Sequence, residues 1–472
     1  MKHERDSTRA DRVGQVKIAF TNKPLTAWGG TCTLAAKFLE QIGFREWVET
    51  QIPIEEESPN AKGTYGKVLA QFLTCLCGGT RFSHLGWWGH GLSAVQECFA
   101  VAWLPQATSV LTRFWGKIKG QKEAEAVRSG ACRLTRLLLE QEEIKGEDLY
   151  LDSSVCERYG KQEGALRGYN PKKHGRPSHH PLKAAVSSGY VVNLWNRSGN
   201  THSAHRCVEF YEQTLRELPE GLVIGRTLAD SGFYDIGFIE HLEGLNKLYT
   251  IAVPISRVIQ SQLLALEKWE SVAAGIEVAE FYFQHHDLKW TRPRRYTAIR
   301  QHILTRPSAT GKQPMLFREM EEHREYRYSV LITNDEQSAP MEIWRGYRPR
   351  AKEENCIKDL KEGYGWDSFN VHGFWATEAV MVIVAMVFHN LILYLNRKVL
   401  SPEGVIPQLK TMRSKYFAWP AVLGNAGGTP TLRLGIQDKS LRGKIRYWLR
   451  QIGALSLKLN CNAVDTLIPV MA

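Results

Sequence analysis

Four residues of the segment YRPRAKEENCIKDLK have the types and the spacing to act together on a phosphate backbone. They are Tyr347, Arg350, Glu354 and Lys361. At about 100° per residue, all four lie within one stripe of a helix. Arginine and lysine hold phosphates, tyrosine bonds or stacks, and the carboxylate can reach a metal ion. A solvent-exposed helix face with salt bridges gives a similar pattern, and Lys352, Glu353, Lys358 and Asp359 supply such pairs.

Two aspartates follow apolar runs that are typical of strands. Asp152 ends the run DLYLD, and Asp230 ends the run GLVIGRTLAD. If these strands are neighbours in an open α/β sheet, the two carboxylates lie side by side, and a divalent cation would relieve their repulsion. Cleavage of a phosphodiester with two metal ions needs several carboxylates at one point. A strand-terminal aspartate is also a common turn residue, so neither one decides the matter alone.

The signature Tyr-x2-Arg-x3-Glu-x6-Lys resembles that of a large group of bacterial insertion-sequence DDE transposases, which share the ribonuclease H-like fold of the retroviral integrase superfamily. All four positions match. Further segments are similar to the same group: LDSS, GYNPKKHGRPSHHPLK, GNTHSA, ADSGFY and HGFWATEA. The resemblance extends from about residue 147 to residue 435.

This resemblance implies that Asp152, Asp230 and Glu354 are the catalytic acids and the metal ligands. It implies contacts from Tyr347, Arg350 and Lys361 to DNA at the transposon end. Pro349 should kink the signature helix or begin it near Tyr347, because proline lacks a backbone donor.

The expected activity is metal-dependent strand cleavage at terminal inverted repeats, followed by strand transfer into target DNA. We expect two Mg²⁺ or Mn²⁺ ions, because the ligands are all oxygen. The partner would be double-stranded DNA, and binding two ends implies a homodimer in the synaptic complex. Two alternatives remain: a nuclease of the same fold without strand transfer, and a non-catalytic DNA-binding protein derived from a transposase.

Two basic segments are candidates for further DNA contacts. In LKWTRPRRYTAIR, Trp290 is surrounded by Lys289, Arg292, Arg294, Arg295 and Arg300. Trp290 could stack on an unpaired base of a distorted DNA end, or it could be a hydrophobic anchor. The second segment follows Asp152 and carries Arg167, Lys172, Lys173 and Arg176. Its glycines and prolines predict an extended arm that contacts phosphates. The adjacent His179 and His180 cannot easily converge on one zinc ion.

Apolar runs between 147 and 253 predict three strands, a helix, and then alternating strand and helix. This order predicts an α/β fold with a ribonuclease H-like mixed sheet flanked by helices. Residues 147–267 would form the first part of the catalytic domain and 339–400 the second part, with the Glu354 helix. The segment 268–338 between them predicts a β-rich insertion.

The flanking regions are expected to be helical. Residues 1–146 show helical spacing of apolar residues and no competing strand pattern. The segment LPQATSVLTRFWGKIKG predicts a helix with Arg113, Lys117 and Lys119, either a DNA-reading unit or an ordinary solvated helix. We expect the whole of 1–146 to be a DNA-binding region, and 401–472 to be a basic helical region.

Composition limits the partners and the compartment. The 472 residues carry a formal net charge of +12, which favours nucleic acid or an anionic membrane surface as partner. His389 and Asn390 interrupt the apolar stretch 379–395, so we expect a buried helix there and no membrane contact. The charged amino terminus and nine scattered cysteines without a CxxC pair predict the bacterial cytosol, in association with the nucleoid.

Overall fold

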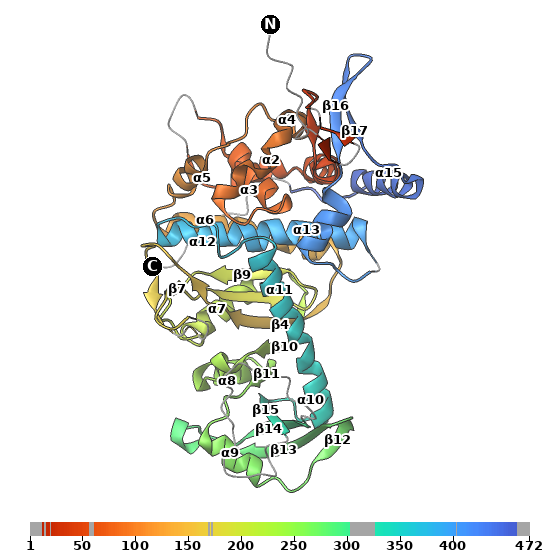
Figure 1. Ribbon diagram of the computed structural model, residues 1–472. Coiled ribbons are helices and arrows are strands. Elements are labelled where there is room, and N and C mark those ends of the chain that lie inside the picture. Colours follow the sequence, from red (N-terminus) through yellow and green to blue (C-terminus); the bar gives the residue numbers. More distant parts are fainter. Residues whose placement is uncertain are drawn as a thin grey trace.

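The protein is described by a computed structural model that covers residues 12–13, 16–18, 20–55, 61–168, 170, 173–302, 326–402 and 404–459. Its centre is a nine-stranded mixed sheet in the order β12-β13-β14-β15-β11-β10-β4-β8-β9 (Figure 1). The predicted mixed sheet is therefore confirmed. One part of this sheet consists of β4 (Gly146–Ser153), β8 (Leu182–Val186), β9 (Val191–Trp195), β10 (Val223–Ala229) and β11 (Leu248–Ala252).

The two ends of this half-sheet have different strand directions. β4, β10 and β11 are parallel, while β8 and β9 are antiparallel to their neighbours. Parallel neighbours need a crossover connection, and the helices α7 (Cys207–Glu217) and α8 (Ile236–Gly244) supply it. All five residues of β8 are buried, which shows that helices cover both faces of the sheet there.

One long helix packs beside β9. It consists of α12 (Phe374–Val382), η8 (Ile383–Phe388), α13 (His389–Leu395) and η9 (Asn396–Leu400). It contacts α6 (Gln121–Gln141) along its length (Figure 1). Within the described ranges it alone is long and apolar enough to cross a membrane, and its most apolar window is 100% buried inside the molecule. The buried helix expected from the sequence is confirmed.

The strand-rich segment continues the catalytic sheet. It contains α9 (Arg257–Leu264), β12 (Glu270–Ala273), β13 (Ile276–Phe283), η5 (His286–Leu288), β14 (Arg294–His302) and β15 (Tyr326–Thr333). β15 pairs antiparallel with β11, so one ladder of hydrogen bonds joins the segment to the catalytic strands. These four strands make the segment β-rich, as the sequence predicts.

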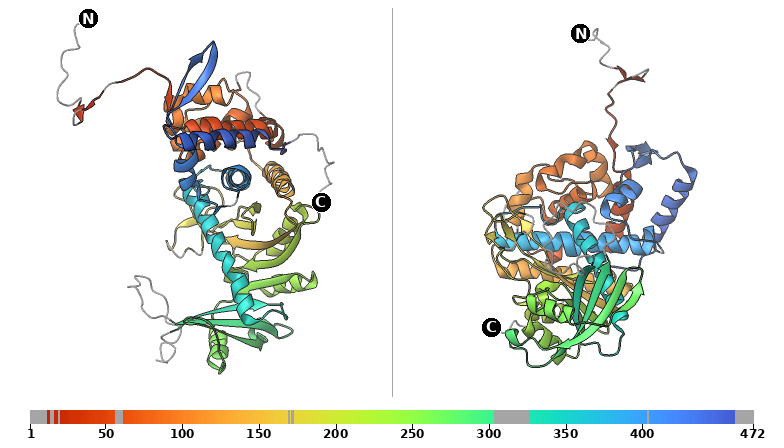
Figure 2. Two further views of the ribbon diagram at one scale, coloured as in Figure 1. Left: turned by 90° about the vertical axis from the view of Figure 1, so that its right-hand side faces the viewer. Right: turned by 60° about the horizontal axis from the view of Figure 1, so that its bottom comes forward.

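The signature segment forms two helices with a tight turn between them. α10 (Pro340–Tyr347) leads into the 3-10 turn η7 (Arg348–Arg350), and α11 (Ala351–Glu362) follows. The interruption surrounds Pro349, as expected from its missing donor. α10 and α11 run as a diagonal column from the strand-rich segment to the long helix (Figure 2, left).

The amino-terminal region is helical except for three two-residue strands. Its helices are η2 (Thr31–Ala35), α1 (Ala36–Ile42), α2 (Phe44–Gln51), α3 (Thr64–Leu76), η3 (Phe82–Gly91), α4 (Leu92–Cys98), α5 (Thr108–Trp115) and α6. The strands are β1 (Arg12–Val13), β2 (Val16–Lys17) and β3 (Leu25–Thr26). The prediction of a wholly helical region is wrong at these strands, and β3 forms because it pairs with a strand of the carboxyl-terminal region.

The carboxyl-terminal region is also not wholly helical. After α14 (Leu409–Met412) and η10 (Arg413–Phe417), the strands β16 (Ala421–Ala426) and β17 (Thr429–Leu434) form a hairpin, and α15 (Lys439–Gly453) follows. Gly427 and Gly428 make the turn with positive φ angles of 57° and 81°, a conformation that glycine adopts without strain. This hairpin corrects the prediction of a purely helical region.

Candidate active site

Asp152 and Asp230 lie at the same end of two adjacent strands. In the parallel ladder between β4 and β10, Ala229 stands opposite Leu151, so the two aspartates follow side by side. The Ser153 amide donates to Asp152 Oδ1 at 2.8 Å, and the Gly232 amide donates to Asp230 Oδ1 at 2.9 Å. Asp230 thereby caps the short turn η4 (Ser231–Phe233). The expectation that these carboxylates are neighbours is met by the strand pairing.

Arg350 contacts both aspartates. Its Nη2 lies 3.5 Å from Asp152 Oδ1 and 3.8 Å from Asp230 Oδ2. Burial raises the pKa of Asp152, and Arg350 opposes that shift. Burial also disfavours the charged form of Arg350, but Asp152, Tyr347 and Asp230 raise its pKa above the ordinary value. The guanidinium therefore stays charged and compensates the two acids.

Tyr347 and Lys361 fasten the signature helices to the loops that carry the acids. Tyr347 Oη donates to the carbonyl of Ala229, the residue before Asp230, at 3.0 Å. Burial raises the pKa of Tyr347 to about 12, so the phenol remains a donor at neutral pH. Lys361 Nζ donates to the carbonyl of Val155 at 2.9 Å. The single helical stripe expected from the spacing is broken at Pro349: Tyr347 ends α10, Arg350 ends η7, and Glu354 and Lys361 are on α11.

Glu354 lines the same cavity as Asp230. This cavity has a volume of 1020 Å³. It is lined by Ser153, Ser154, Val155, Glu157, Asn170, His180, Asn200, Thr201, His202, Ser203, Asp230, Ser231, Gly232, Glu354, Ile357, Lys358, Lys361 and Glu362. Glu354 is exposed, one turn of helix beyond Arg350. Asp230 and Glu354 therefore line one cavity, although they come from different elements.

The donor set fits a hard divalent cation, although the side chains are not gathered around one. Across the described ranges, no three His, Cys, Asp or Glu side chains form a group that could hold a metal ion as they stand. Two adjacent carboxylates already share one positive group, the guanidinium of Arg350. Carboxylate oxygens are the ligands that Mg²⁺ prefers in proteins.

Glu353, the neighbour of Glu354, forms a buried ion pair with Lys183. The two side chains are 3% and 2% exposed. Lys183 stands on β8 directly opposite Asp152. Glu353 is therefore not part of a solvent-exposed salt-bridged face, and the pair fixes α11 against the catalytic sheet. The sequence indicates this buried pair in one way: Lys183 stands within the otherwise apolar run LKAAV, and a buried lysine needs a partner.

The chain matches the model of the family "Transposase DDE domain group 1" over residues 9–435. It belongs to this family. The transposase is accordingly a DNA-cleaving and strand-transferring enzyme, its family depends on divalent metal, and its partner is DNA. The resemblance to DDE transposases, inferred from the signature, is confirmed.

No curated protein is similar enough to this transposase to match it. A solved structure described as a piggyBac transposase synaptic complex with hairpin DNA, determined by cryo-EM, is similar to it. The two share 12% sequence identity with a TM-score of 0.39, over 82% of this chain and 78% of that chain.

Three residues expected to contact DNA from the strand-rich segment of the transposase are buried. Trp290 is 3% exposed, its ring centre lies 5.0 Å from that of Tyr234 at an interplanar angle of 40°, and the guanidinium of Arg294 lies 4.8 Å from its ring centre. Arg294 pairs with Glu243, and Arg295 pairs with Glu280. The interpretation of Trp290, Arg294 and Arg295 as DNA contacts is therefore wrong. Their aromatic and acidic neighbours come from other elements, and the hydrophobic-anchor alternative holds for Trp290.

Arg292 differs from these neighbours. Its side chain is 60% exposed, although its Nη2 lies 2.6 Å from Glu243 Oε2. Glu243 is 9% exposed and also pairs with Arg294, so Arg292 is the outer of two cations on this carboxylate.

The basic arm after Asp152 is more ordered than expected. β5 (Cys156–Glu157), β7 (Pro177–His179) and β6 (Leu166–Arg167) form a small sheet in that order. Lys173 is exposed and pairs with Glu157 at 3.0 Å, and the Arg176 guanidinium lies 4.7 Å from the ring centre of Tyr159. Lys172 lies outside the described residues.

The two histidines at the end of this arm are structural. His179 Nδ1 accepts from Arg158 Nε at 3.0 Å, and its Nε2 lies 2.8 Å from the carbonyl of Glu163. His180 Nδ1 lies 2.7 Å from the carbonyl of Thr201. Both ring nitrogens of His179 are therefore within hydrogen-bond distance of protein groups.

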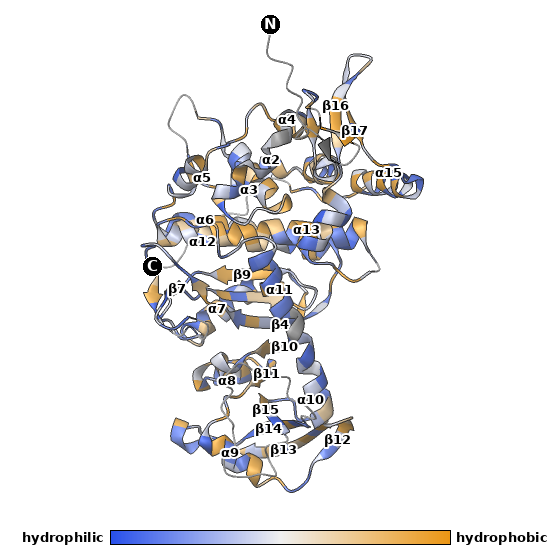
Figure 3. Cartoon of the chain, in the orientation of Figure 1, coloured by the Kyte–Doolittle hydropathy of each residue, from blue (hydrophilic) through white to orange (hydrophobic). Residues whose placement is uncertain are grey.

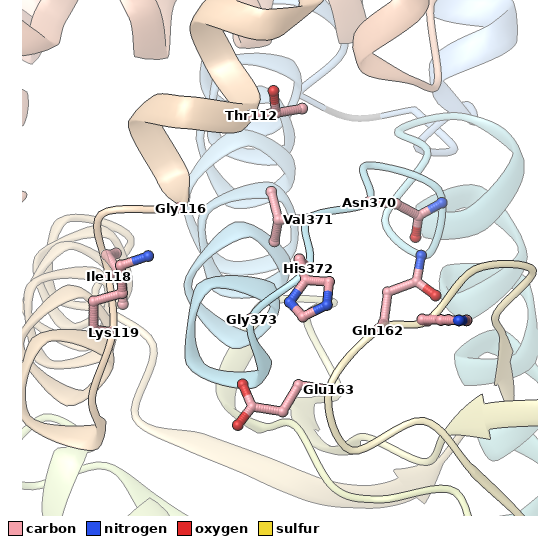
Figure 4. Close-up of a pocket in the computed structure, with 11 residues that line it drawn as sticks. Thr112, Gly116, Ile118, Lys119, Gln162, Glu163, Asn370, Val371, His372 and Gly373 are labelled. Atoms are coloured by element: carbon pink, nitrogen blue, oxygen red, sulfur yellow. The ribbon is translucent and has the colours of Figure 1, made fainter.

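A second cavity, of 450 Å³, lies between the end of α5 and the loop before α12 (Figure 4). Its lining includes Lys119, Glu163 and His372, and none of the three candidate acids. Glu163 Oε2 accepts from the Phe374 amide at 2.9 Å and so caps α12. This cavity is separate from the site of the strand ends.

Proposed function

We propose that this transposase cleaves DNA at the terminal inverted repeats of an insertion sequence and joins the freed 3′ ends to target DNA. Asp152, Asp230 and Glu354 are the catalytic acids. The observation that carries the proposal is the parallel pairing of β4 with β10, which places Asp152 and Asp230 side by side with Arg350 across both.

The three acids would hold two Mg²⁺ ions, with Mn²⁺ as a substitute. Such ions, when bound, activate the attacking oxygen and stabilise the leaving one. The donors are all carboxylates, and the buried Asp152 is held on a strand by the Ser153 amide. Glu354 is on a helix that the buried Glu353–Lys183 pair fixes against the sheet.

The signature residues bind the DNA strand that enters the cavity. Arg350 is proposed as a phosphate contact from its place in the signature; its side chain is 10% exposed and faces the two acids, so it would have to turn from them toward the DNA strand. Lys361 holds the loop that follows Asp152, and Tyr347 holds the residue that precedes Asp230. Both residues would lie along the path of the DNA strand. Lys173, Arg176 and Arg292 are exposed candidates for further phosphate contacts, and we assign Lys172 to the same group from its sequence position.

The enzyme would act as a homodimer when it holds two transposon ends, and it would act on chromosomal DNA in the bacterial cytosol. Sedimentation of the protein with a short duplex of the transposon end tests the dimer. A complex with one protein chain and one end, unchanged at high protein concentration, would refute it.

The acids are tested with the isosteric variants Asp152→Asn, Asp230→Asn and Glu354→Gln. Each should abolish cleavage of a labelled transposon end in Mg²⁺ while end binding stays largely intact. Asp148→Asn is the matched control, since Asp148 lies on the same strand four residues before Asp152, where its amide donates to Ser187 Oγ. Retained cleavage by the Glu354→Gln protein would remove Glu354 from the site.

A plasmid target in the same reaction separates the alternatives. Joined product supports a transposase, whereas cleavage without joined product would indicate a nuclease of the same fold. Activity that does not respond to Mg²⁺ would favour a DNA-binding protein without catalysis.

A further inference from the structure

α15 is a strongly basic helix without an acid. Between Lys439 and Gly453 it carries five Lys or Arg residues and no Asp or Glu. They are Lys439, Arg442, Lys444, Arg446 and Arg450, and all five are exposed. The helix lies at the edge of the molecule in Figure 1 and in the right view of Figure 2.

The apolar side of α15 is already covered by the protein. Ile445, Trp448 and Ile452 are buried, and the Trp448 ring lies 5.3 Å from that of Tyr416. α15 packs against α1, η2 and η9. Figure 3 shows hydrophobic and hydrophilic residues alternating along it, as expected for a helix with one buried side. Since this side is buried, the helix cannot insert into a lipid surface.

Four of the basic residues share one face. At about 100° per residue, Lys439, Arg442, Arg446 and Arg450 lie within an arc of about 80°, opposite or beside the buried side. From Lys439 to Arg450 this face is about 16 Å long. We call it the basic face of α15.

The charges of the basic face have no acidic partner among the described residues. Arg442 Nε donates to the carbonyl of Ile436 at 2.7 Å, and Arg450 Nε donates to the carbonyl of Arg446 at 3.4 Å. These bonds leave the net charge uncompensated. Like charges four residues apart destabilise a helix, so the isolated protein gains no stability from this arrangement.

We propose that the basic face of α15 binds the phosphate backbone of double-stranded DNA without reading its sequence. Duplex DNA presents about ten phosphates over a length of about 16 Å, so the four cations can all find a partner. Contacts to phosphates position DNA but carry no sequence information. The inference rests on the proposed function only in that both need DNA, and it adds a binding surface outside the catalytic cavity.

The test uses the full-length protein and a fluorescent duplex of random sequence at several NaCl concentrations. The measured quantity is the slope of log affinity against log salt concentration. In the variant Arg442→Gln/Arg446→Gln/Arg450→Gln, the magnitude of this slope should fall by about 2.7, since each lost phosphate contact removes about 0.9. At 100 mM NaCl the affinity should fall at least about tenfold. A control that removes three exposed arginines elsewhere, Arg216→Gln/Arg257→Gln/Arg327→Gln, should keep the original slope.

A charge-conserving variant separates binding from folding. Arg442→Lys/Arg446→Lys/Arg450→Lys should retain the salt slope, because the phosphate contacts need charge alone. An unchanged slope in the glutamine variant, or an equal loss in the lysine variant, would overturn the inference. So would wild-type protein that binds vesicles rich in phosphatidylserine more tightly than the duplex.

The same measurements distinguish this inference from the proposed function. Asp152→Asn should lose cleavage and keep the salt slope. If the glutamine variant keeps its slope while Asp152→Asn loses cleavage, the basic face is refuted and the catalytic assignment stands.

Discussion

Replacement of Lys183 by methionine should destabilise the protein strongly, because it leaves Glu353 buried without a positive partner. The two side chains are 2% and 3% exposed and form an ion pair. Removing one member of a buried pair costs about 3–5 kcal/mol, since the remaining charge is no longer compensated. Folded proteins have a total stability of about 5–15 kcal/mol, so this loss is a large part of it.

The double variant Lys183→Met/Glu353→Leu makes the reasoning quantitative. Replacing both members with apolar residues of similar size is often neutral, so the double variant should lie within about 2 kcal/mol of the wild type. Urea denaturation followed by far-ultraviolet circular dichroism measures all the proteins. The single variants should also cleave a transposon end more slowly, because α11 carries Glu354. Single variants as stable as the wild type would refute the buried ion pair. A double variant that loses as much stability as the two single variants together would also refute it.

Three further predictions concern other parts of the molecule. Burial raises the pKa of Glu378 to about 7, above its unfolded value, so the folded state binds the proton more tightly. Stability should therefore fall by about 3 kcal/mol as the pH rises from about 4.5 to 7, and Glu378→Gln should remove that part of the pH dependence of the melting temperature; an unchanged dependence contradicts it. Gly168→Ala should destabilise the basic arm and slow cleavage, since a Cβ there would lie 1.9 Å from the carbonyl of Gly199; Gly244→Ala, which meets nothing within 4 Å, is the control in the same assays. Trp290→Ala should lower stability by about 3–5 kcal/mol in denaturation experiments while DNA affinity stays unchanged, and a loss of affinity in a fully folded variant would restore the stacking interpretation.

The positions of the two aspartates could be predicted because they depend on short-range patterns. Short strands are visible in the sequence as apolar runs; Asp152 is the next-to-last residue of β4, and Asp230 directly follows β10. Pairing of β4 with β10 follows from the usual order of strands and helices in such a sheet. The helical spacing of the signature then identifies the face that must meet them.

Partners from distant parts of the chain could not be predicted in this way. Glu353 has charged neighbours along its own helix, but its partner Lys183 lies on β8. Trp290 looks like an exposed aromatic between basic residues until Tyr234 covers it. In both cases the decisive neighbour is separated by more than fifty residues, and only the folded sheet brings it near.

The carboxyl-terminal hairpin is a different case, since its signal is local. The segment AVLGNAGGTPTLRL has two short runs around a Gly-Gly pair, which is a common hairpin turn. The abundance of lysine and arginine in 401–472 favoured the prediction of a basic helical region over that of a hairpin. Its pairing with β3, which makes an edge strand of a two-residue segment, was not visible in the sequence.

Tyr347 is one connection between the strand-rich segment and the strand end that carries Asp230. Its ring packs with Ile343 of α10 against a small cluster of Val278, Ile299 and Leu331 from the segment's own strands. Its hydroxyl bonds the carbonyl of Ala229, directly before Asp230. A second connection is the ladder between β11 and β15. Because packing and a continuous ladder both cross this boundary, the segment is a fixed part of the platform that positions Asp230. DNA bound to it would be held at a constant distance from the acids.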